Sequence, residues 1–143
     1  MNEPDALEIF NSGYNCTQAV LSRFAERFGM SREEAFKVAT GFGGGIARSG
    51  EACGAVTGAV MALGLRYGRK EGGDRADQEN TYTKVNEFLE RFRALHGSCV
   101  CRVILEGIDL KTPEGQQAFG EKNMMDVCRR CVVDAADLVE SLV

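Results

Sequence analysis

Residues 53–65 read CGAVTGAVMALGL, a run in which small side chains recur at helical spacing. Glycine inside a helix costs about 1 kcal/mol relative to alanine, and here Gly54 and Gly58 lie one turn apart. A face of this kind suits a helix that another backbone approaches closely. We therefore expect the Gly54/Gly58 face to be buried inside the domain, with a homodimer as the less favoured alternative.

Helical patterns continue on both sides of this run. Residues 77–95 form the clearest amphipathic helix, which Gly97 ends. Further helices are predicted near residues 5–10, after the N-cap candidates Asn15 and Ser31, over residues 98–105, after Thr112-Pro113, and from about residue 125. No stretch alternates apolar and polar residues as a half-buried strand would. The prediction is an all-α fold, a single compact helical domain of five to seven helices over residues 1–143.

Composition limits the classes of function. The formal net charge of −4 gives no electrostatic basis for binding nucleic acid or an anionic membrane. The longest uncharged run, residues 52–65, is shorter than a membrane span, so no membrane insertion is expected. Residues 1–5 lack the basic and apolar regions of a signal peptide. We therefore expect a cytoplasmic protein whose thiols stay reduced.

Six cysteines in 143 residues are the main chemical signal. A single cysteine on an apolar helix face is usually a small core residue. Six together, four of them in a C-x-C and a C-x-x-C, favour metal binding or redox chemistry over disulfide stapling in a reduced compartment. They lie at Cys16, Cys53, Cys99, Cys101, Cys128 and Cys131.

The spacing of the cysteines narrows this chemistry without deciding it. The C-x-x-C at Cys128 and Cys131 falls inside a predicted helix, whereas the thioredoxin motif stands where a strand meets a helix. A C-x-C within a helical segment is a poor zinc knuckle, so zinc is less favoured. Iron–sulfur ligation tolerates scattered cysteines when helices bring them together.

Two features near the cysteines have more than one interpretation. The loop from Gly41 to Gly45 lacks the spacing of a dinucleotide fingerprint. It either lets backbone N–H groups approach a cluster or an anion, or it is a flexible connection, and Arg48 beside it is a candidate neighbour of the site. His96, at a predicted helix end, is interpreted as a charge partner of that helix terminus rather than as a metal ligand.

The residues Cys53-Gly-Ala-Val-Thr-Gly58 match a C-G-A-x-x-G motif, with single cysteines before and after it. In this the chain resembles the C-GCAxxG-C-C family of small redox-active proteins over nearly its whole length. The resemblance implies four functional cysteines, which fall on Cys16, Cys53, Cys101 and Cys131 as cofactor and metal ligands. Cys99 and Cys128 are then additions to the pattern.

A similar domain in split-Soret cytochromes c implies the cofactor, an iron–sulfur cluster of the 2Fe–2S type. This chain has no C-x-x-C-H, so covalent haem is not expected. The resemblance thus implies electron transfer through a cysteine-ligated cluster, as an electron carrier or an oxidoreductase with a redox partner protein. The alternatives are a metal-free thiol–disulfide redox protein and a non-redox metal-binding or interaction module.

Overall fold

Helices make up the regular structure of residues 4–143, the part of the chain that the computed structural model describes. Outside the helices, these residues contain one isolated β-bridge, between Ala52 and Val100. The α-helices are α1 (Ala6–Asn11), α2 (Cys16–Ala25), α3 (Arg32–Ala39), α4 (Gly54–Tyr67), α5 (Arg75–His96), α6 (Cys101–Ile104), α7 (Pro113–Glu121) and α8 (Met124–Leu142). Short 3-10 turns follow α2 at Glu26–Phe28 and α3 at Thr40–Phe42.

The all-α prediction is confirmed, but the predicted number of helices was too low. The described residues form eight α-helices rather than five to seven. The shortest, α1 and α6, would not be stable in isolation, because short helices pay the cost of nucleation without enough hydrogen bonds to offset it. Tertiary packing supports both, since Ala6 and Ile9 of α1 and Cys101 of α6 are buried.

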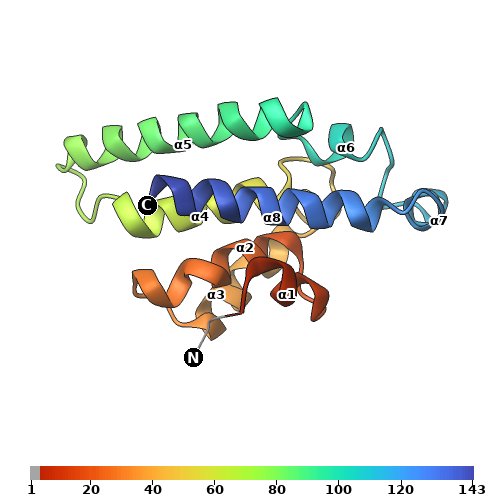
Figure 1. The fold of residues 1–143 in the computed structure, drawn as a ribbon, viewed down its shortest axis with the longest axis horizontal. Helices are drawn as coiled ribbons and strands as arrows, with labels where there is room; N and C mark the ends of the chain where they lie inside the picture. The colour runs from red at the N-terminus through yellow and green to blue at the C-terminus, as the bar shows by residue number, and fades with distance from the viewer. Residues whose placement is uncertain (1–3) are drawn as a thin grey trace.

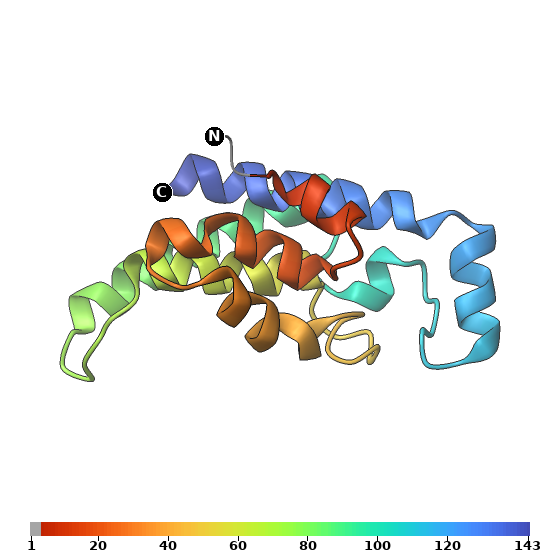
Figure 2. The same ribbon diagram turned by 90° about the horizontal axis from the view of Figure 1, so that it is seen from below.

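The helices are arranged in three layers (Figure 1). Helix α5 lies on one side, α4 and α8 run through the middle, and α2 lies on the other side with α1 and α3. Helix α7 stands apart at one end, across the direction of the bundle (Figure 2). In both views α2, α4 and α8 begin at that same end, so their N-termini, which carry partial positive charge, face one region of the molecule.

Close packing of α2 against α4 confirms the expectation for the Gly54/Gly58 face. A Cβ atom on Gly54 would lie 2.7 Å from Thr17 Oγ1, and one on Gly58 would lie 2.8 Å from the Thr17 carbonyl oxygen. These distances are too short for any side chain. The two glycines therefore allow the backbones of α2 and α4 to meet within the chain, and this contact fixes the start of α4 beside the start of α2.

The main core lies between the three layers. Its largest fully buried side chains come from α2, α4, α5 and α8, and include Phe24, Leu63, Phe88, Phe92 and Val132. A smaller cluster of buried residues, around Leu105, Ile108 and Met124, lies under α6 and the start of α8 and includes Cys101. Among the described helices, none combines the length and the apolar character that crossing a membrane requires.

Candidate functional site

The start of α2 places Cys16. Asn15 is the N-cap: its side chain accepts a hydrogen bond from the Gln18 N–H at 2.8 Å, and the Gln18 side chain accepts one from the Asn15 N–H at 2.9 Å. Asn15 also donates to the Thr40 carbonyl at 3.1 Å. Cys16 is thus the first residue of a helix whose beginning is tied to the loop that follows α3.

A short antiparallel pairing places Cys53 beside Cys101. The Cys53 N–H donates to the Cys99 carbonyl at 2.8 Å, and the Cys101 N–H donates to the Glu51 carbonyl at 2.6 Å. Cys53 is the N-cap of α4, and Cys101 is the first residue of α6. Two segments nearly fifty residues apart in sequence therefore deliver their thiols to one place.

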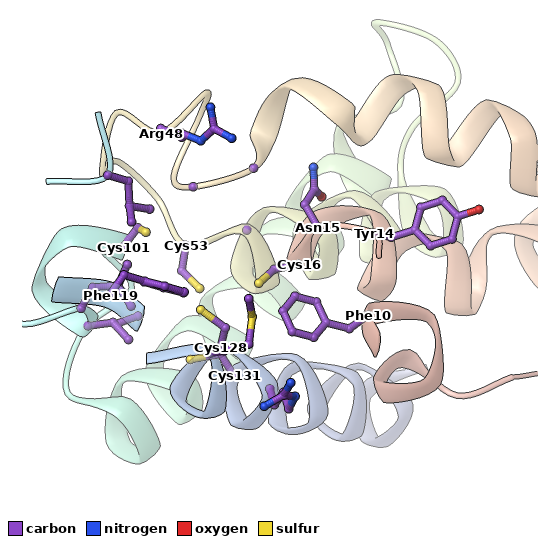
Figure 3. Close-up of a pocket in the computed structure, with 18 of the residues that line it drawn as sticks. Phe10, Tyr14, Asn15, Cys16, Arg48, Cys53, Cys101, Phe119, Cys128 and Cys131 are labelled. Atoms are coloured by element: carbon purple, nitrogen blue, oxygen red, sulfur yellow. The ribbon is translucent and has the colours of Figure 1, made fainter. Parts of the chain in front are cut away.

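Helix α8 supplies the last two thiols from its first two turns. Cys128 and Cys131 are three residues apart, so they share a face of the helix. Cys131 is 1% exposed, whereas Cys128 is half-buried. The helix lies in the middle layer, and this face is turned toward the starts of α2 and α4 (Figure 3).

These elements surround a cavity of about 1110 Å³. Five of the six cysteines line it, namely Cys16, Cys53, Cys101, Cys128 and Cys131 (Figure 3). Cys99 does not. It packs against the main core, with its sulfur 4.0 Å from the Leu89 carbonyl oxygen. The four cysteines given by the family pattern therefore meet at one cavity, and Cys128 joins them.

The thiols are paired by shared protons. A hydrogen bond between Cys16 and Cys128 raises the pKa of Cys16 and lowers that of Cys128, so the proton stays on Cys16. A hydrogen bond between Cys131 and Cys53 raises the pKa of Cys131 and lowers that of Cys53. Burial raises the pKa of Cys101 to about 12. Cys53 and Cys128 are consequently the two sulfurs that ionise most readily.

His96 contacts this site from the side of the core. Its Nδ1 atom lies 3.8 Å from Cys131 Sγ, and its Nε2 atom lies 2.9 Å from Asp134 Oδ2, although the N–H is not aligned for a hydrogen bond. The ring also packs on Phe92, with 4.6 Å between ring centroids. The His96 ring therefore contacts Cys131 on the side that faces the core. The interpretation of this residue as a charge partner of its helix end overlooked that contact.

The loop between α3 and α4 forms a left-handed turn over the cavity. Five consecutive residues have positive φ, with values of 68°, 70°, 68°, 47° and 66° from Gly44 to Arg48. L-residues avoid this region at a cost of roughly 1–2 kcal/mol each, and a β-branched residue such as Ile46 is especially disfavoured there. The turn is held by hydrogen bonds from the Arg48 N–H to the Gly43 carbonyl and from the Glu51 N–H to the Gly45 carbonyl, both 2.9 Å long.

A glycine at position 45 is required by close contact with the site. A Cβ atom there would lie 2.7 Å from Cys101 Cβ and 2.7 Å from the Glu51 nitrogen. The loop thus has a fixed conformation against the thiols, and of the two sequence interpretations the flexible connection is the weaker one.

The thiols that line the cavity suit an iron–sulfur group by their chemistry rather than by a preformed coordination geometry. Across residues 4–143, no three Cys, His, Asp or Glu side chains already stand in positions to coordinate one metal ion. The chemistry of the set nevertheless suits iron and sulfide, because thiolate is their usual ligand and two of the five sulfurs have a lowered pKa. Loading a cluster would displace the protons that now link the thiols in pairs.

Comparison with known proteins places this site in context. Residues 14–142 match the family described as "Putative redox-active protein (C_GCAxxG_C_C)". An uncharacterized protein of Archaeoglobus fulgidus is 31% identical over 135 residues, which cover 89% of this chain and 85% of that protein. No solved structure matches the chain significantly.

Proposed function

The chain belongs to the C_GCAxxG_C_C family, and from this premise we propose that it is an electron-transfer protein whose thiols bind an iron–sulfur cluster. One observation carries the proposal: thiols from α2, α4, α6 and α8 line a single cavity. Core cysteines with no common role would be scattered through the interior, as Cys99 is. A bound cluster would supply reversible one-electron transfer.

The surroundings of the thiols favour an anionic group. Cys16 begins α2 and Cys53 caps α4, so the partial positive charges of two helix N-termini are directed at the site. Arg48 and Arg129 also line the cavity, and no Asp or Glu of residues 4–143 does. Thiolate ligands and a cluster with net negative charge would be stabilised by these groups.

Two ligand sets are compatible with this cavity. Both contain Cys16, Cys53 and Cys131. The family pattern gives Cys101 as the fourth ligand, whereas Cys128 also lines the cavity and shares a face of α8 with Cys131. Serine variants of these two residues distinguish the sets, because only the true ligand will be needed for the iron and sulfide content of the native protein.

The test is anaerobic reconstitution with ferrous iron and sulfide, followed by assays of iron, acid-labile sulfide and visible absorbance. We expect equal amounts of iron and sulfide in the native protein, none in Cys16→Ser, Cys53→Ser or Cys131→Ser, and an unchanged content in Cys99→Ser, the matched control. Protein that stays colourless with six free thiols would overturn the proposal, and stoichiometric zinc without colour would replace it with a metal-binding module.

A second candidate, thiol–disulfide exchange without metal, is favoured by the thiol pairs. The Cys128 thiolate would attack oxidised glutathione, breaking its S–S bond and releasing one glutathione thiolate. The Cys16 sulfur would then displace the second glutathione to form the Cys16–Cys128 disulfide, and the Cys16 proton would pass to a released glutathione thiolate. Equilibration of the metal-free protein in glutathione buffers, followed by mass spectrometry of the trapped thiols, tests this. A reversible two-electron couple at Cys16 and Cys128, in protein that takes up no iron, would make this the function.

A further inference from the structure

The cavity is larger than a cluster bound by the thiols would require. Its volume of about 1110 Å³ slightly exceeds the usual range for small-molecule sites, roughly 300–1,000 Å³. A 2Fe–2S cluster is only a few ångströms across and would lie among the sulfurs. The remaining wall includes Phe10 from α1 and Phe119 from α7, which approach the thiols from opposite sides (Figure 3). The space next to the thiols is therefore bounded by apolar aromatic surface.

The charge of the lining has one sign. Arg48 and Arg129 are the charged residues that line the cavity among the described residues, although the chain as a whole carries a net charge of −4. A positive cavity in an acidic protein selects anions, because negative molecules are attracted to the site and repelled by the rest of the surface.

The two arginines differ in whether the guanidinium group already has a partner within the protein. Arg129 forms an ion pair with Asp126 and donates to the Asn11 side chain at 3.1 Å. The Arg48 guanidinium has no hydrogen bond or ion pair with any residue of 4–143, and the left-handed turn places this exposed residue at the rim of the cavity, away from the thiols (Figure 3). Strained backbone of this kind persists where function requires it. Arg48 is thus the group free to bind a ligand.

We infer that the cavity binds a small organic monoanion, a carboxylate with an aromatic or other apolar body. Its carboxylate pairs with Arg48, and its body packs against Phe10 and Phe119 next to the thiols. The inference does not depend on which redox group the thiols carry. If a cluster is bound there, the protein acts on a bound substrate and is more than a carrier between proteins.

The test uses 2-naphthoate as the probe and the uncharged 2-naphthalenemethanol as its isostere. Binding is followed by fluorescence anisotropy with the full chain in low salt, kept reduced with uncharged dithiothreitol. We expect saturable binding of 2-naphthoate and about tenfold weaker binding of the alcohol, because the alcohol cannot pair with a guanidinium. Inorganic phosphate, added as a competitor, should displace the probe weakly, since it has no apolar body.

Arginine variants locate the binding. Arg48→Asn removes the charge with a residue that tolerates positive φ, and should weaken binding of 2-naphthoate about tenfold. Arg48→Lys should keep most of the affinity. Arg130→Asn, on the exposed side of α8, makes the same change in charge and should have no effect. Circular dichroism and melting temperature establish that each variant is folded.

The inference would be overturned if 2-naphthoate did not bind, if Arg48→Asn bound it as tightly as the native protein, or if the alcohol bound as tightly as 2-naphthoate. Displacement of the probe by phosphate as strong as by 2-naphthoate itself would also overturn it, in favour of a simple anion site. Iron and sulfide content is measured separately, so failure here leaves the cluster proposal standing, and failure of the cluster proposal leaves this binding test intact.

Discussion

At the scale of residues, proton sharing divides the cysteines into unlike groups. Cys53 and Cys128 accept hydrogen bonds from neighbouring thiols, and the pKa of each is lowered. Cys16 and Cys131 hold the shared protons. Reactivity depends on the thiolate, so chemically identical side chains in one cavity will react at different rates. Cys128 is the more accessible of the two sulfurs with a lowered pKa, since Cys53 is only 6% exposed.

This difference predicts the order of alkylation in the metal-free protein. Because the pKa of Cys128 is lowered, its rate of reaction with iodoacetamide should reach half its maximum at a lower pH than that of an ordinary thiol. Cys101 should stay protonated and slow until about pH 12. Peptide mapping at a series of pH values measures both rates.

The variant Cys16→Ala tests the cause of the effect. It removes the hydrogen bond that stabilises the Cys128 thiolate, so the pH midpoint for alkylation of Cys128 should rise. Cys99→Ala, which removes a thiol outside the cavity, should leave the midpoint where it is. If both variants behave alike, the proton is not shared between Cys16 and Cys128.

At the scale of elements, the helix starts hold the site in place. The Asn15 capping box fixes the first turn of α2, and the two glycines of α4 allow it to pack against that turn. Cys16 and Cys53 lie where these helices begin. The stability of the elements and the geometry of the thiols are therefore linked, and a change in either helix start should alter both.

Two glycines of α4 offer a test variant and a matched control for this link between helix packing and thiol geometry. Gly58→Ala should destabilise the protein by about 1–3 kcal/mol, because its Cβ would overlap the Thr17 carbonyl. Apart from its chain neighbours and the backbone of its own helix, no atom of residues 4–143 lies within 4 Å of where the Cβ of Gly64 would be, so Gly64→Ala should stabilise by about 0.5–1 kcal/mol. Urea unfolding measures both changes. A stable Gly58→Ala protein with unaltered cysteine reactivity would contradict the packing described for α2 and α4.

Two N-cap residues offer a second pair of test variant and matched control. Asn15→Ala and Ser31→Ala each remove an N-cap hydrogen bond, and each should cost about 0.5–2 kcal/mol in the free energy of unfolding. Asn15 precedes Cys16, whereas Ser31 caps α3 far from the thiols along the chain. Only Asn15→Ala should therefore also change the alkylation rate of Cys16. Equal effects of the two variants on that rate would show that the cap does not position the thiol.

The sequence predicted most of these elements because their signals are local. The caps at Asn15, Ser31 and Thr112 and the stop at Gly97 are confirmed. Each of the eight α-helices, including the short α1 and α6, falls in a segment that was predicted to be helical, so the predicted total of five to seven was lower than the number of segments behind it. The left-handed turn over residues 44–48 could not be predicted, since Ile46, Ala47 and Arg48 are not residues that favour positive φ.

The sequence predicted part of the site and missed the rest. The motif and the order of the single cysteines identified four residues that do line the cavity. Cys128 was set aside by the family pattern, although its spacing of three from Cys131 places both on one helix face. His96 follows Phe88 and Phe92 on the same face of α5, a helical repeat that indicates an inward orientation. Which thiols share protons depends on helix packing, which the sequence does not specify locally.

At the scale of the whole molecule, α8 unites the fold and the site. It packs against α1, α2, α4, α5 and α7, and its apolar face completes the main core. The same helix carries Cys128 and Cys131. The site therefore joins the beginning of the described chain to its end, and a covalent link across it would restrict the unfolded chain strongly.

Oxidation of the metal-free protein tests this restriction. Mild oxidation with diamide should link Cys16 to Cys128 before Cys53 to Cys131, because both pairs are hydrogen-bonded but only Cys16 and Cys128 are partly exposed. A bridge that closes a loop of about 100 residues stabilises by about 5 kcal/mol in the chain-entropy description. Peptide mapping identifies the bridge, and unfolding in urea without reductant measures the gain. Cys128→Ser should lose the gain and Cys99→Ser should keep it; a first bridge through Cys99 would refute the arrangement of thiols.

The position of α8 also determines when the protein can first do its chemistry. As the chain emerges from the ribosome, Cys16, Cys53 and Cys101 appear long before the helix that completes their cavity. Until α8 packs into the middle layer, Cys16 and Cys53 lack Cys128 and Cys131, the thiols to which they are hydrogen-bonded in the folded protein. Assembly of the site therefore waits for α8, and until this helix is made, oxidants and stray metal ions can reach thiols that the folded protein encloses.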